Sequence, residues 1–230
     1  MNFARNIIFY IIFYFWTILF FCLFSPVTFF SRPFAVKIAN FWTKSIISLT
    51  RFLLLIDFEI IGDLKILERP LIIVSNHQSA WETFFFPSIL PDSVFVMKDS
   101  LTKIPIFNSY FKKLGYIPIN RKQGYSSTKS ILNNAKKSLR LGAKHIIIFP
   151  EGTRVEPGKK VELSSSGIKI LYKNLNMPIV VTKHNSGKFW KNKKFIKSKG
   201  KISIEIFPVI KTGLSKEEVI KKINLIFMKN

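Results

Sequence analysis

A histidine and a glutamate five residues apart, His77 and Glu82, are the residues of this chain best suited to acid–base chemistry. The histidine follows an apolar run from Leu71 to Val74, which places it just beyond a predicted strand. An imidazole exchanges a proton near neutral pH, and a neighbouring carboxylate fixes its tautomer and stabilises the imidazolium. Ser79 and Glu82 also have the spacing of a capping box that would start the next helix. Both uses of Glu82 remain open because a carboxylate has two oxygens.

A second group able to do chemistry, from Glu151 to Arg154, also leaves a predicted strand, through a proline and then a glycine. Backbone N–H groups around the Gly152 turn, the Thr153 hydroxyl and the Arg154 guanidinium can together bind an anion such as a phosphate. The alternative is a sharp turn in which Arg154 makes a structural ion pair with Glu151 or Glu156.

Together the two groups resemble the glycerolipid acyltransferases, in particular the 1-acylglycerol-3-phosphate acyltransferase family, which combines an H-x4-D block with an F-P-E-G-T-R block. The segment Phe149 to Arg154 has the second block in full, and the resemblance covers residues 70 to 185. It implies that His77 is the base that deprotonates a glycerol hydroxyl, and that Glu82 holds its imidazole. Glu82 replaces the family's usual aspartate. The extra methylene shifts the carboxylate by about 1.5 Å, enough to matter for a hydrogen bond, so the exact acceptor stays open.

The resemblance extends to the segment between the two blocks, which begins at Lys98 and ends at Arg121. It implies that Lys98, Arg121 and Arg154 grip the phosphate of the acceptor, with the turn Glu151 to Thr153 completing the substrate-binding site. The ordinary alternative for Lys98 is a solvated lysine, whereas Arg121 carries more weight because arginine is rare in this chain. The resemblance implies no metal and no organic cofactor. The acyl donor would be acyl-CoA or an acyl carrier protein.

The elements that would position these residues alternate between strands and helices. Apolar runs predict strands at residues 58–61, 71–74, 94–97, 116–120, 145–149, 179–182 and 202–206. Helical spacing and capping signals predict helices near residues 82–90, 105–114, 126–141, 165–175 and 215–227. A lysine-rich stretch at residues 188–201 predicts a basic hairpin or loop. We therefore expect an α/β domain with a largely parallel sheet flanked by helices, similar to the glycerol-3-phosphate acyltransferase fold.

The N-terminal part of the chain is unusually apolar. Residues 7–24 carry no charge, and eighteen helical residues barely span a hydrocarbon core. A signal peptide fits less well because the run is long and no A-x-A cleavage site follows it. Residues 34–56 place Lys37, Lys44 and Arg51 on one helical face, a pattern typical of a helix lying in the membrane interface. A core helix is the alternative for this second segment.

We therefore expect residues 1–56 to form a two-helix membrane anchor and residues 57–230 to form the catalytic domain. Positive residues flanking the apolar segments favour a catalytic domain on the cytoplasmic face, which is the inner membrane if the cell is bacterial. Whether residues 7–24 cross the bilayer is left open.

The formal charge of +23 indicates an anionic partner, either nucleic acid or an anionic membrane surface. A compositional bias toward lysine is the simpler explanation, and both can hold. The hydrophobic N-terminal segment favours membrane lipids over nucleic acid. One cysteine, Cys22, excludes an internal disulfide and a cysteine-rich zinc site. The three histidines, His77, His145 and His184, are too scattered to predict a metal cluster.

The resemblance, together with the hydrophobic N-terminal segment, implies a membrane-associated acyltransferase. It would move an acyl chain to the sn-2 hydroxyl of lysophosphatidic acid (1-acylglycerol 3-phosphate) and form phosphatidic acid in phospholipid biosynthesis. One alternative is acylation of another lysolipid, such as a lysophospholipid with a head group or a lyso-ornithine lipid. The other is a non-catalytic basic protein that binds membranes.

Overall fold

The computed structural model describes residues 2–120, 124–159 and 161–228. Within them, one seven-stranded sheet has the order β1-β7-β6-β2-β5-β3-β4. Its strands are β1 (Ile56–Ile61), β2 (Leu71–Ser75), β3 (Ser93–Lys98), β4 (Ile117–Ile119), β5 (His145–Ile148), β6 (Ile179–His184) and β7 (Gly200–Ile206). Neighbouring strands are parallel except β6 and β7, which are antiparallel. The predicted α/β class with a largely parallel sheet is confirmed.

The centre of the sheet explains why the two chemical groups can meet. All residues of β2 and of β5 are buried, as expected for parallel strands with helices on both faces. The two strands are parallel neighbours, with Leu71 opposite His145 and Val74 opposite Ile148. Their carboxyl ends therefore lie side by side, at the end of the sheet where the parallel strands finish, here called its carboxyl edge. This is the edge at which open α/β sheets commonly bind ligands.

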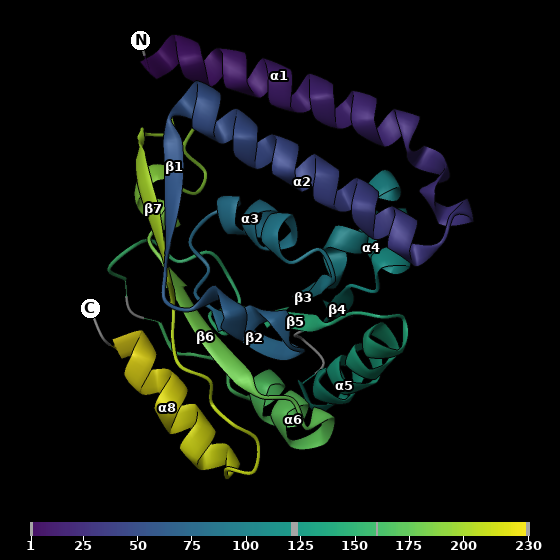
Figure 1. Ribbon diagram of the computed structural model, residues 1–230, viewed down its shortest axis with the longest axis vertical. Coiled ribbons are helices and arrows are strands. Elements are labelled where there is room, and N and C mark those ends of the chain that lie inside the picture. Colours follow the sequence, from purple (N-terminus) through teal and green to yellow (C-terminus); the bar gives the residue numbers. More distant parts are fainter. Residues whose placement is uncertain (1, 121–123, 160, 229–230) are drawn as a thin grey trace.

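Helices cover both faces of the sheet (Figure 1). They are α1 (Asn2–Leu23), α2 (Arg32–Leu54), α3 (Trp81–Ile89), α4 (Pro105–Leu114), α5 (Gly124–Arg140), α6 (Ser166–Leu175), α7 (Ser186–Phe189) and α8 (Lys216–Met228). An apolar core beneath α1, α2 and α3 fills one face, and a second core beneath α5, α6 and α8 fills the other. The sequence did not predict α7 or the short 3-10 helices η1 (Ser25–Phe29), η2 (Leu64–Glu68) and η3 (Asp99–Lys103).

The two N-terminal helices, α1 and α2, are joined by η1 and lie side by side, with α2 between α1 and α3 (Figure 1). Within the described residues, only Phe3–Leu23 is long and apolar enough to cross a membrane. On α2 the three cations predicted to share a face, Lys37, Lys44 and Arg51, are all exposed. The buried face of α2 packs on the sheet-covering helix α3, and Ile47 of α2 belongs to the same apolar core as the sheet. The division at residues 56 and 57 therefore stays a prediction.

Candidate active site

His77 and Glu82 are in direct contact beyond the carboxyl end of β2. The Nδ1 atom of His77 lies 2.9 Å from an Oε atom of Glu82, whose side chain is fully buried. One face of the imidazole stacks on the Phe149 ring, with ring centroids 4.2 Å apart and ring planes at 14°. Because Nδ1 is engaged by the carboxylate, Nε2 is the ring nitrogen left to take a proton. The pair has the geometry that an oriented general base requires.

The carboxylate of Glu82 is held by a dense set of donors. Its Oε1 atom accepts the backbone N–H groups of Gln78 and Ser79, each at 2.7 Å. Its Oε2 atom accepts the hydroxyl of Ser79 and, at 2.8 Å, the hydroxyl of Ser186. One carboxylate therefore orients His77 and also binds the turn that precedes α3, although the N-cap of this helix is Ala80 and not Ser79.

Glu82 stays ionised within this buried site. Burial alone would raise the pKa of Glu82, but His184, His77 and the Ser79 hydroxyl together outweigh it and hold the pKa well below its usual range. A permanent negative charge at this point favours the imidazolium that forms when His77 accepts a proton.

The second sequence group holds the backbone of His77. The backbone N–H of His77 donates to the carboxylate of Glu151, and the N–H of Val155 donates to the His77 carbonyl at 2.8 Å. Burial, and to a lesser degree the charge of Glu82, raises the pKa of Glu151 to about 7, against the opposing effect of the His77 N–H. The structure thus places Glu151, predicted as a substrate-binding residue, against the catalytic histidine candidate.

The turn that follows Glu151 presents an arginine to solvent. Gly152 adopts a φ of 70°, a left-handed conformation that glycine tolerates best. Thr153 and Arg154 are exposed, and Arg154 Nη1 lies 3.4 Å from the amide oxygen of Asn192. In the described part of the chain, no ion pair joins Arg154 to Glu151 or Glu156, the alternative raised above. The guanidinium can therefore face an anion.

The structure describes only one of the other two predicted phosphate ligands, Lys98 and Arg121. Lys98 is exposed at the carboxyl end of β3, opposite Ile119 of β4. Arg121 lies outside the described residues. Lys98 is therefore at the same end of the sheet as His77 and Arg154, and its role as a phosphate ligand stays a prediction.

Sequence reasoning missed three residues that support this site. The side-chain amide of Asn76 makes two hydrogen bonds to the backbone of His184. Its Nδ2 donates to the His184 carbonyl at 2.8 Å, and its Oδ1 accepts the His184 N–H at 2.9 Å. The His184 ring is buried, with Nε2 2.8 Å from the Asn76 carbonyl and 3.9 Å from Glu82. Ser186, in α7, supports Glu82 directly. Asn76 directly follows β2, whereas His184 ends β6 and Ser186 lies just beyond it; because β2 and β6 are parallel neighbours, this shared end of the sheet was the available signal.

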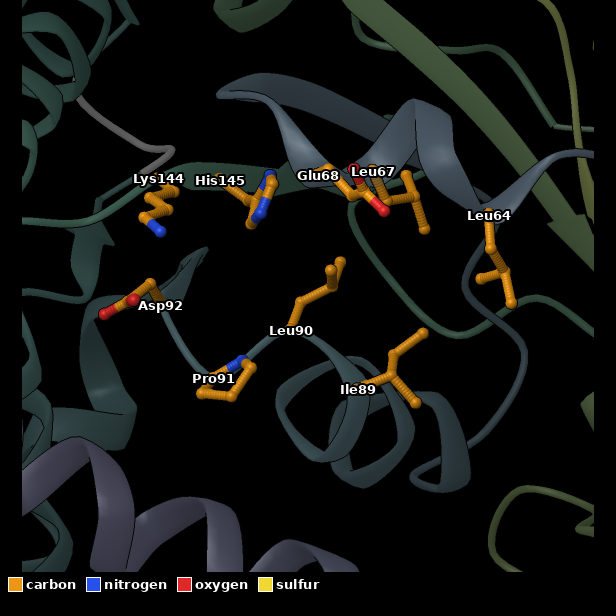
Figure 2. A pocket seen from close by; sticks show the side chains of 9 residues that line it. All are labelled: Leu64, Leu67, Glu68, Ile89, Leu90, Pro91, Asp92, Lys144 and His145. Atoms are coloured by element: carbon orange, nitrogen blue, oxygen red, sulfur yellow. The ribbon is translucent and has the colours of Figure 1, made fainter.

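Two cavities help to locate the site within the fold. One of about 440 Å³ adjoins Glu151 and Gly152, with an apolar floor formed by Val96, Ile119 and Ile148. The other, of about 270 Å³, lies where β5 begins, at the opposite edge of the sheet (Figure 2). It is lined by Leu64, Leu67, Glu68, Ile89, Leu90, Pro91, Asp92, Lys144 and His145. His145 therefore belongs to a region separate from the catalytic candidates.

Known proteins share both this sequence and this fold. The family model described as "Acyltransferase" matches residues 57–183. The 1-acyl-sn-glycerol-3-phosphate acyltransferase of Pseudomonas aeruginosa is 31% identical over 211 residues, which cover 90% of this chain and 80% of that protein. The protein of the same name from Borreliella burgdorferi is 27% identical over 67% of this chain and 66% of its own.

A solved structure shares the architecture along almost the whole chain. The 1-acyl-sn-glycerophosphate acyltransferase PlsC of Thermotoga maritima aligns with a TM-score of 0.78 and 22% identity, over 98% of this chain and 94% of that one. The matched family segment contains both His77 and Arg154, whose surroundings are described above. The family model over more than half of the chain, together with the 31% identity to the Pseudomonas protein, shows that this chain belongs to the acyltransferase family.

Proposed function

We propose that this protein transfers a fatty acyl chain to the sn-2 hydroxyl of 1-acylglycerol 3-phosphate and so forms phosphatidic acid. The observation that carries the proposal is the contact of 2.9 Å between His77 and Glu82, next to the turn that presents Arg154. The names of the Pseudomonas and Borreliella relatives, both 1-acyl-sn-glycerol-3-phosphate acyltransferases, support the choice of acceptor.

The proposed reaction uses the acceptor alcohol as the nucleophile. His77 Nε2 takes the hydroxyl proton while the oxygen attacks the thioester carbonyl, and Glu82 stabilises the imidazolium that results. When the tetrahedral intermediate collapses, the C–S bond breaks and the thiolate leaves with the proton that His77 returns. An ester forms, a thioester is consumed, and His77 returns to its neutral form.

The donor is proposed to be an acyl thioester, either acyl-CoA or acyl carrier protein. The thioester supplies the driving force, so this scheme uses no metal ion and no organic cofactor. Arg154, with Lys98 and Arg121, is proposed to hold the phosphate of the acceptor, since a guanidinium binds phosphate oxygens in pairs.

We further propose that the protein acts at the cytoplasmic surface of a membrane. The apolar helix Phe3–Leu23 supports membrane association. It packs along α2, and Phe9 lies in the apolar core of the domain. These contacts favour a helix lying in the membrane interface over one that crosses the bilayer alone.

An acyl-transfer assay with labelled donor and a panel of lysolipids tests the reaction. We expect lysophosphatidate to be used in preference to lysophosphatidylcholine and lyso-ornithine lipid, and His77→Ala to lower kcat by about 10²- to 10⁴-fold. Equal rates for native protein and His77→Ala would refute the catalytic role. Preference for another lysolipid would replace the acceptor but keep the chemistry.

A further inference from the structure

Residues 191–199, here called the lysine strap, run beside the N-terminal half of α1. No acidic residue occurs anywhere from position 163 to 204, whereas the strap alone contains five lysines. Four of these are exposed, namely Lys191, Lys193, Lys194 and Lys199. Two apolar side chains between them, Phe195 and Ile196, are each 47% exposed. The strap therefore presents cations and apolar groups together.

The strap is fastened to α1 by specific hydrogen bonds. The buried side-chain amide of Asn6 makes two hydrogen bonds to the backbone of Lys197. It accepts the Lys197 N–H at 2.8 Å and donates to the Lys197 carbonyl at 3.2 Å. The Lys197 ammonium is turned inward, donates to the carbonyls of Lys191 and Lys194, and lies 5.3 Å from the centroid of the Trp190 ring. This buried lysine closes the loop, so the other four lysines are held on its outside.

The apolar part of the strap continues an exposed apolar face of α1. The Phe195 ring stacks on Tyr10 with centroids 4.9 Å apart, and it lies 6.0 Å from the ring of Phe3. Along α1, Phe3, Ile11 and Phe15 are at least 60% exposed. The lysines thus border an apolar surface that extends along a helix of about 33 Å.

We propose that the lysine strap docks the enzyme on an anionic phospholipid surface, with its lysines at the headgroups and Phe195 and Ile196 at the acyl boundary. Cations beside exposed aromatic and aliphatic groups are what an interfacial segment requires. A soluble acidic partner, such as a carrier protein, would satisfy the lysines but would leave the continuous apolar face of α1 uncovered. The proposal rests on the proposed function, because it adds a partner to the same site.

Docking would also place the phosphate-binding turn. Asn192, within the strap, contacts Arg154 at 3.4 Å. A strap seated on the headgroups therefore puts Arg154 at the level of a lysolipid phosphate. The acceptor could then be drawn from the bilayer without first entering water.

A fluorescent label tests whether the strap touches the membrane. The full chain carries Cys22→Ser to remove its one cysteine, and Ile196→Cys is labelled with an environment-sensitive dye. Leu225→Cys is the matched control, because Leu225 is 54% exposed and lies on α8, on the other side of the molecule from α1 (Figure 1). With phosphatidylglycerol vesicles we expect a blue shift and headgroup-level quenching at position 196 and neither at 225. No shift at 196, equal shifts at both positions, or a shift caused by acyl carrier protein in place of vesicles would overturn the proposal.

Charge variants separate the strap from the general basicity of the protein. Lys191→Gln, Lys193→Gln and Lys194→Gln together should weaken binding to phosphatidylglycerol vesicles by about tenfold or more. The same number of changes at Lys211, Lys221 and Lys222 should change it less than about twofold. Equal losses in the two sets would refute a dedicated surface. Docking is read without acyl transfer, so His77→Ala should dock normally. If the native protein binds vesicles but transfers no acyl chain, only the proposed reaction is refuted. If it transfers an acyl chain but the strap does not bind vesicles, only the role of the strap is refuted.

Discussion

The Glu151 carboxylate accepts a hydrogen bond from the backbone N–H of His77. The segment Phe149 to Arg154 therefore holds in place the histidine that is proposed to be the catalytic base. Phe149 stacks on the imidazole, and Val155 binds the His77 carbonyl. The segment that resembles a phosphate-binding turn therefore also fixes the position and ring plane of His77. This dual use explains why the two blocks leave adjacent parallel strands.

Glu151 should make stability depend on pH in an unusual direction. Burial raises its pKa in the folded protein from the ordinary 4.5 to about 7, so the folded state binds a proton more tightly than the unfolded state. Stability should therefore fall as pH rises from about 4.5 to 7, by up to about 3 kcal/mol. Urea unfolding in mild detergent across this range measures the slope. In Glu151→Gln, which is always neutral and keeps an acceptor oxygen, this contribution should vanish. An unchanged slope would show that Glu151 is not its source.

Glu82→Asp should impair the enzyme even though aspartate is the usual residue at this position of the H-x4-D block. The shorter side chain cannot reach His77 Nδ1, the Gln78 and Ser79 N–H groups and Ser186 from one position. We expect kcat to fall about ten- to hundredfold, because a misplacement of about 1 Å at a catalytic group has an effect of this size. Steady-state kinetics measure it, with circular dichroism as the control for folding. Activity equal to that of the native enzyme would mean that the loop adjusts to either acid.

Ser186 should act on the rate through Glu82. Ser186→Ala removes the donor that lies 2.8 Å from Oε2, and a hydrogen bond to a charged group is worth about 1.5–3 kcal/mol, which corresponds to a factor of about ten or more. We expect kcat to fall by that factor, while the KM for lysophosphatidate stays within about twofold. Ser186→Thr keeps the hydroxyl and should restore most of the rate. A loss in Ser186→Thr as large as that in Ser186→Ala would point to packing of α7 as the cause.

Arg154→Lys should separate charge from geometry at the proposed phosphate site. Lysine keeps the positive charge but loses the paired N–H donors of the guanidinium. We expect the KM for lysophosphatidate to rise about tenfold with kcat little changed. Lys188→Gln, a nearby change of surface charge in α7, is the control and should alter KM less than twofold or so. An unaltered KM in Arg154→Lys would remove Arg154 from the phosphate site.

The sequence predicted the strands well because burial on both faces demands continuous apolar runs, as in Leu71 to Val74. The sequence also predicted the pairing of His77 with Glu82, because the two residues are only five positions apart, across the turn between a strand and a helix. It could not predict Ser186 or Asn76, because their partners lie more than one hundred residues away and are brought close by the order of the strands. The inward-facing Lys197 was equally hidden, since in sequence it is one lysine among many.

The pairing of β1 with β7 has a consequence for how the protein is made. β1 follows the N-terminal helices, yet its partner strand begins at Gly200, near the end of the chain. During synthesis α1 and α2 therefore leave the ribosome long before the sheet can be completed. The helices can form and pack on each other first, while β1 still lacks its partner strand. The sheet would then be completed only when β7, the last of its described strands along the chain, pairs with β1.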